Sequence, residues 1–112
     1  MQYALLIYTD PNYLDDQSPL QLEAITAEYA VLLVDPQVVS SAQLEPIETA
    51  TSVRLSKGRT LLTDGPFADT KEVLGGISII DAPDLDQAIE FAKRIPALKV
   101  GGTVEIRPVV QR

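Results

Sequence analysis

The sequence predicts an α+β fold: a ferredoxin-like α/β sandwich in which two helices cover one mostly antiparallel sheet, with an extra β-hairpin. Three observations support this prediction. Strand-like apolar segments lie at both ends of the chain, two helix starts carry capping residues, and a Lys-Gly turn joins two strand-like segments in the middle. With 112 residues, the chain fits a single domain spanning residues 1–112.

The first strand is expected at residues 3–8, which read Tyr-Ala-Leu-Leu-Ile-Tyr. Both alternating faces of this segment are apolar, which is typical of a strand covered on both sides. In so short a chain, two helices can cover one face of the sheet. We therefore expect a second subunit to cover the other face, so that two sheets form a dimeric α+β barrel.

The first helix is expected to begin after Ser18 and to run to about Val34. Ser18 can cap this helix, Pro19 suits its first position, and Gln21 can close a capping box. Asp35 stands before a proline and is therefore disfavoured in a helix, so the helix should end there. The buried stripe of the helix is expected to comprise Leu22, Ile25, Tyr29 and Leu32.

A β-hairpin is expected where residues 52–56 and 59–63 flank Lys57-Gly58. Pairing across this turn sets Val53 near Leu62 and Leu55 near Thr60. The other strands are expected at residues 38–42, 75–81 and 103–107, with a loop at 45–48. Pro108 places the far end of the last strand at an edge or terminus.

The second helix is expected to begin after Asp84, with Gln87 three residues later, and to stop at Pro96. Lys93 and Arg94 lie near its C-terminal end, where their positive charges interact favourably with the helix dipole. Its buried stripe is expected to comprise Leu85, Ala88, Ile89, Ala92 and Ile95.

Composition excludes several functions. Sixteen acidic and nine basic residues give a net charge of −7, which opposes nucleic-acid and membrane-surface binding. The chain has no cysteine and no histidine, so thiol chemistry, disulfides and the usual neutral-pH base are missing, and no metal or cofactor is expected. No apolar run reaches the roughly 18 residues that cross a bilayer, and the start lacks the basic flank of a signal peptide, which predicts a cytoplasmic protein.

The segment Asp64-Gly65-Pro66-Phe67 resembles the motif of the YCII-related, DGPF-motif family of small bacterial proteins. The resemblance covers nearly the whole chain. It extends to Tyr3–Tyr8, Ser18-Pro19, Lys71-Glu72, Leu74-Gly75-Gly76, Asp84–Ala88, Ile95-Pro96-Ala97 and Val104–Pro108.

The resemblance implies a dimeric α+β barrel of ferredoxin-like subunits. Many members carry a His-Asp pair in the cleft, some relatives act on halogenated aromatic lactones or quinols, and DGPF members are often linked with extracytoplasmic-function sigma factors. Here Glu28-Tyr29 stands where a histidine is often found. Histidine-dependent chemistry therefore does not transfer to this chain.

Asp64 is the candidate catalytic residue, although an aspartate before Gly-Pro commonly holds a turn, and this structural role is favoured. Gly65 and Pro66 are turn formers in either interpretation. Phe67 is a candidate ligand contact, with a core or dimer anchor as the favoured alternative. Gly75 and Gly76 precede a strand, which indicates close backbone packing rather than a phosphate loop.

Three further residues are candidate ligand contacts. Lys71, beside Glu72, could orient a polar or anionic ligand, or both could be solvated charges. Tyr8 could hydrogen-bond a ligand, although a paired interface tyrosine is favoured; Tyr3 falls on the opposite face of the strand. Arg107 could receive a carboxylate, or it could pair with Glu105 on the same face.

Three functions remain open at this point. The first is a small cytoplasmic homodimer that binds a small molecule or serves a regulatory role with a sigma factor. The alternative is a cofactor-free enzyme of the lyase, isomerase or dehalogenase type that uses Asp64 with a tyrosine or Lys71. A sigma-factor interaction module without a ligand would follow from the resemblance alone.

Overall fold

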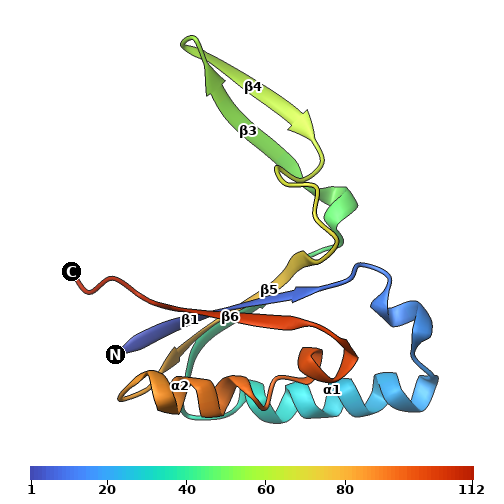
Figure 1. The fold of residues 1–112 in the computed structure, drawn as a ribbon, viewed down its shortest axis with the longest axis vertical. Helices are drawn as coiled ribbons and strands as arrows, with labels where there is room; N and C mark the ends of the chain where they lie inside the picture. The colour runs from blue at the N-terminus through green and yellow to red at the C-terminus, as the bar shows by residue number, and fades with distance from the viewer.

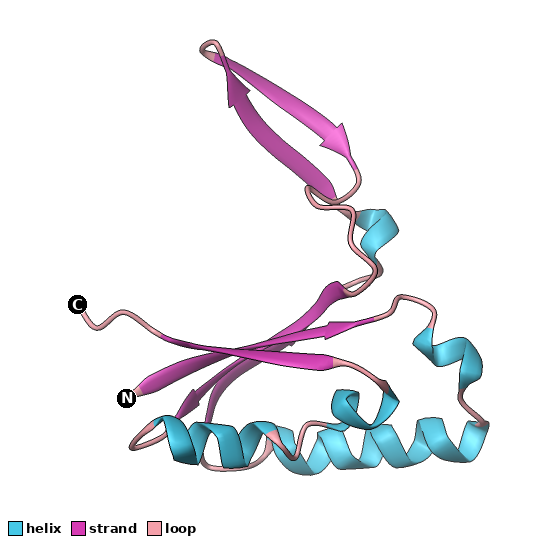
Figure 2. Ribbon diagram, viewed as in Figure 1, coloured by secondary structure: helices cyan, strands magenta, loops and turns pink.

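A computed structural model describes residues 1–112 and has a four-stranded antiparallel sheet with both helices on one side of it (Figures 1 and 2). The strand order is β2-β5-β1-β6, and β3 and β4 form a separate hairpin. The α+β prediction is therefore confirmed. The strands are β1 (Gln2–Thr9), β2 (Val38–Gln43), β3 (Thr51–Ser56), β4 (Arg59–Asp64), β5 (Val73–Asp81) and β6 (Thr103–Pro108). The helices are α1 (Pro19–Leu33) and α2 (Leu85–Ala92), with short 3-10 helices at Tyr13–Asp16, Ile47–Thr49 and Pro96–Val100.

Both helices begin where their caps predict. The Ser18 hydroxyl accepts the Gln21 N–H at 3.2 Å, and the Gln21 side chain accepts the Ser18 N–H at 2.7 Å, which completes the capping box. Asp84 accepts the Gln87 N–H at 2.9 Å. Local hydrogen bonding between neighbouring residues therefore fixes both helix starts.

The core lies between the helices and one face of the sheet. Leu5 and Ile80 are fully buried there, and Tyr3 is nearly so. The stripe predicted for α2 is partly wrong, because Leu85 and Ile89 are 49% and 36% exposed. The other three predicted members, Ala88, Ala92 and Ile95, are buried as expected, and Phe91, which the prediction did not include, is buried with them.

The end of α2 also differs from the prediction. The helix ends at Ala92, and Pro96 begins a 3-10 helix instead of being the stop signal. Arg94 turns back to Asp35, with its Nη1 donating to Oδ2 at 3.0 Å, and its guanidinium lies over the Phe91 ring. A backbone N–H from Gln37 and the Arg94 side chain lower the pKa of Asp35. This ion pair joins the ends of the two helices.

The loop predicted at residues 45–48 is partly helical, since a 3-10 helix begins at Ile47. None of the helices is long and apolar enough to span a bilayer.

Neither α1 nor α2 covers the second face of the sheet, and we call it the open face (Figure 2). The cross-strand pairing shows which residues lie on the open face, because directly opposed residues of two strands point to the same side. Leu6 pairs with Ile77 and Glu105, and Ala4 pairs with Ile79 and Arg107. The centre of the open face is therefore apolar, with a charged strip along the edge strand β6.

The β3–β4 hairpin stands away from the sheet on the side of the open face (Figure 1). Its predicted register is confirmed: Val53 pairs with Leu62 and Leu55 pairs with Thr60. The turn is tight, with Lys57 and Gly58 both at positive φ, as a two-residue hairpin loop requires. The base is held by the Gly65 N–H, which donates to Ala50 O at 2.7 Å, and by the Ser52 hydroxyl, which donates to Gly65 O at 2.8 Å.

Candidate functional site

A cleft of about 480 Å³ opens where the end of β1, the start of β6 and the segment before β5 meet. Five of its six lining residues are polar or charged, and the sixth is a tyrosine. They are Tyr8, Thr70, Lys71, Glu72, Thr103 and Glu105. We refer to this feature as the β6 cleft. It contains two of the residues that the sequence singled out for ligand contact, Tyr8 and Lys71.

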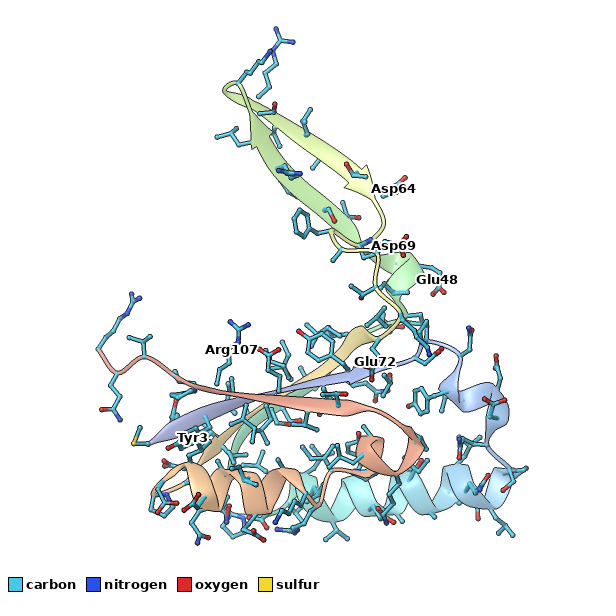
Figure 3. All side chains as sticks on the ribbon, in the orientation of Figure 1. Tyr3, Glu48, Asp64, Asp69, Glu72 and Arg107 are labelled. Carbon is cyan, nitrogen blue, oxygen red and sulfur yellow. The ribbon has the colours of Figure 1, made fainter.

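Strand alternation places Tyr8 in this cleft. Tyr3 points to the opposite side of β1, is 3% exposed, and belongs to the core. Figure 3 shows Tyr3 on the helix side of the sheet, whereas Glu72 and Arg107 lie on the other side. Of the two tyrosines in β1, Tyr8 is thus the one beside the charged residues, directly opposite Thr103 in the register.

Glu72 is fixed by hydrogen bonds from two threonines. The Thr103 hydroxyl donates to the Glu72 carboxylate at 3.3 Å, and the Thr70 hydroxyl donates to the Glu72 backbone carbonyl at 2.6 Å. The sequence did not indicate either threonine. Thr70 is only two residues from Glu72 in the chain, whereas Thr103 meets Glu72 because β1 pairs with both β5 and β6.

The ion pair expected between Glu105 and Arg107 is present, with the arginine Nε donating to the carboxylate. The two residues lie on the same face of β6, and Glu105 lines the cleft while Arg107 lies beyond it. Arg107 therefore balances one of the two cleft carboxylates. Lys71 remains the single cation that lines the cleft.

The Asp64-Gly65-Pro66-Phe67 segment lies at the base of the hairpin, outside the β6 cleft (Figure 3). Asp64 ends β4 and is exposed. Gly65 is at positive φ, which suits a glycine. Phe67 is 77% exposed and lies outside the core, with the Arg54 guanidinium 5.4 Å from its ring centroid. The structure thus separates Asp64 and Phe67 from Tyr8 and Lys71.

The glycine that makes the closest approach was not singled out in the sequence. A Cβ on Gly102 would lie 2.7 Å from the carbonyl oxygens of Ala97 and Tyr8, whereas the shortest such distance at Gly76 is 3.4 Å. Gly75 would meet Thr9 Oγ1 at 3.9 Å and sits where the β1–β5 register shifts. Gly102 therefore sets how closely β6 approaches Tyr8.

Replacing Gly102 with alanine should destabilise the chain by about 1–3 kcal/mol, because neither backbone carbonyl can move away freely. Urea unfolding followed by circular dichroism measures this change. Gly75→Ala is the matched control and should have a much smaller effect. Equal stability of the two variants would show that the contact at Gly102 is not limiting.

A second hollow of about 340 Å³ lies beside α2, lined by Gln37, Gln87, Glu90, Phe91, Lys93 and Arg94. It contains none of the residues that the sequence indicated. The Gln37 Oε1 atom is buried there without a hydrogen-bond partner. Lys93 and Arg94 are already paired with Glu90 and Asp35, so this hollow offers a ligand fewer free charges than the β6 cleft.

The β6 cleft therefore combines a phenol, two carboxylates, one ammonium group and two hydroxyls. This set suits recognition of a small polar molecule, with Lys71 for an acidic group and Glu72 for a donor. No three acidic side chains gather closely enough to hold a metal ion. The pKa of Tyr29, on α1, is raised chiefly by burial.

Comparison with known proteins gives three findings. A family model described as YCII-related domain matches residues 1–112. An uncharacterized protein of Rhizobium meliloti (strain 1021) is 34% identical over 117 residues, which cover 97% of this chain and 92% of that protein. A solved structure, the 5-chloro-2-hydroxyhydroquinone dehydrochlorinase of Burkholderia phenoliruptrix AC1100 in complex with 2,5-dihydroxybenzoquinone, is 17% identical with a TM-score of 0.47, and the match covers 100% of this chain and 96% of that one.

Proposed function

The chain belongs to the YCII-related domain family, and from this premise we propose that it acts as a cytoplasmic homodimer that binds a small polar molecule in the β6 cleft. The observation that carries the proposal is the meeting of Tyr8, from the first strand, with the adjacent Lys71 and Glu72 at one hollow. Convergent polar groups beside an apolar surface are typical of a ligand site.

The open face supports the dimer. Its centre consists of Leu6, Ile77 and Ile79 with Ala4, which are half-buried within one chain and have no helix above them. Apolar surface of this kind is stabilised when a second copy covers it. The β6 cleft lies at the margin of the same face, so the partner would supply the apolar wall that the cleft lacks in one chain.

The residues favour an aromatic or hydroxylated organic acid as the ligand. Lys71 would bind the acidic group, and the Glu72 carboxylate would accept a hydroxyl hydrogen. Tyr8 would contact the body of the ligand and can donate from its hydroxyl. A regulatory partner such as a sigma factor remains a proposal from the family resemblance, and co-purification would test it.

A cofactor-free enzyme is the second candidate, favoured by the position of Tyr8 and Lys71 in one cleft with Glu72 beside them. A carboxylate and a tyrosine in one site can move a proton to and from a bound substrate. Asp64 lies outside the cleft of its own chain, so Glu72 is better placed than Asp64 for this role. Turnover of a bound ligand would distinguish an enzyme from a binder.

Thermal unfolding in the presence of hydroxybenzoates, hydroxyquinones and aliphatic hydroxy acids tests the binding site. A ligand at 100 times its dissociation constant should stabilise the wild type by about 2.7 kcal/mol, which raises Tm by roughly 10 °C. Glu72→Gln should lose most of this shift, because the amide no longer provides a charged acceptor.

Asp64→Asn is the matched control, because it also removes one carboxylate, but at a residue outside the cleft. It should keep the ligand-induced shift. A shift that Asp64→Asn abolishes and Glu72→Gln retains would place the ligand at the hairpin base and contradict the proposal.

A further inference from the structure

The β3–β4 hairpin exposes apolar side chains that a surface loop does not need. Val53, Leu55 and Leu62 are 65%, 74% and 70% exposed, and Leu61 is 49% exposed. Phe67, just beyond the hairpin, is 77% exposed. Val53, Leu55 and Leu62 share one face of the hairpin, which forms a continuous apolar strip.

The hairpin has no support from the rest of its own chain. Apart from the hydrogen bonds between β3 and β4, the hairpin is held by two at its base. The Gly65 N–H donates to Ala50 O, and the Ser52 hydroxyl donates to Gly65 O. Figure 1 shows it projecting from the end of the sheet without a covering layer. A two-stranded hairpin in this situation is marginally stable in water, and it needs an apolar surface to pack against.

The surface of the chain is larger than a globular protein of its mass requires. A 12.2 kDa monomer exposes roughly 6,100 Å² and has a radius of gyration of roughly 13 Å, whereas this chain has 8076 Å² and 16.0 Å. The excess is roughly 2,000 Å² per chain, or about 4,000 Å² for two chains. This area falls within the range of roughly 2,000–5,000 Å² that obligate homodimers bury.

The charge of the hairpin differs in sign from that of the whole chain. Residues 51–64 contain three basic residues, Arg54, Lys57 and Arg59, and one acidic residue, Asp64. The remainder of the chain therefore has fifteen acidic and six basic residues. None of the three hairpin cations forms a salt bridge within the chain, so they are available to an acidic partner.

We propose that the hairpin is an arm that lies against the second copy of this chain, with its apolar strip packed on the partner and its basic tip on the partner's acidic surface. The inference rests on the proposed dimer but adds an interface separate from the open face. The arm, about 20 Å long, exceeds the roughly 10 Å separation of two packed sheets, so it extends past the partner's sheet.

Charge reversal at the tip tests the arm. Lys57→Glu combined with Arg59→Glu should raise the dimer dissociation constant at least about tenfold at low salt, and the difference should shrink at high salt. Lys93→Glu makes the same kind of charge change just after α2, where Lys93 forms an exposed pair with Glu90, and should change the dissociation constant little. Analytical ultracentrifugation of the full chain measures all three proteins.

Hydrogen exchange of the wild-type dimer provides the second measurement. Amides of residues 51–64 should exchange at least about a hundredfold more slowly than in an unstructured peptide, because the partner covers the arm. A wild type that is monomeric at every concentration would contradict the proposed dimer itself. A dimer whose hairpin amides are unprotected would overturn the arm alone.

Two other results would also overturn the arm. Protected hairpin amides with an unchanged dissociation constant in the tip variant would place the hairpin on its own chain. Binding of duplex DNA that the tip variant loses, again with an unchanged dissociation constant, would assign the basic tip to nucleic acid.

Discussion

Ile79→Lys should convert the proposed dimer to a monomer. Ile79 lies at the centre of the open face, opposite Ala4 on β1 and Ser40 on β2, so no acidic side chain stands directly across from it. In a face-to-face dimer, each variant chain would bury an ammonium group without a counterion, which costs several kcal/mol per ion. We expect the dissociation constant to rise at least about a thousandfold.

Sedimentation across a concentration series checks this result, with circular dichroism to show whether the separated chains stay folded. Val31→Lys is the matched control, because Val31 is 62% exposed on α1, away from the open face. It should remain dimeric. An Ile79→Lys protein that dimerises as tightly as the wild type would show that the open face is not the dimer interface.

Leu5→Ala should destabilise the fold by about 3–5 kcal/mol. Leu5 is fully buried on the helix side of β1, beside Ile106 in the register and within the same core cluster as Ile80. Its truncation removes apolar contacts and leaves a cavity that the rigid sheet cannot close. Since a chain of this size has roughly 5–15 kcal/mol of stability, the loss would take a large part of it.

Urea unfolding at fixed protein concentration measures the change. Leu20→Ala serves as the control, since Leu20 is 77% exposed at the start of α1, and it should cost less than about 1 kcal/mol. If the two leucine variants lost the same stability, the core would not be centred on β1.

Features that depend on neighbouring residues could be predicted from the sequence. The capping box at Ser18, the Asp84 cap and the hairpin register follow from local hydrogen bonding and turn geometry, and all three are confirmed. The Glu105–Arg107 pair belongs to the same class, because strand alternation places residues two apart on one face.

Features that depend on distant segments could not be predicted. Thr103 reaches Glu72 only after the first strand has paired with the last two, and nothing in its local sequence distinguishes it. The α2 stripe was wrong at Leu85 and Ile89 because several apolar residues lie around the helix, and contact with the sheet decides that Phe91 is buried. The separation of Asp64 from the β6 cleft likewise follows from the direction of the hairpin.

The strand order also bears on how the chain reaches its folded state. β1 is made first, yet its two neighbours in the sheet are β5 and β6, which include residues 73–81 and 103–108. The four-stranded sheet therefore cannot be completed until β6 has left the ribosome. Long segments of chain separate β1 from the strands it pairs with. Such non-local pairing slows folding, which places this chain among the slower small domains. The apolar first strand is exposed to aggregation until β5 and β6 have been made.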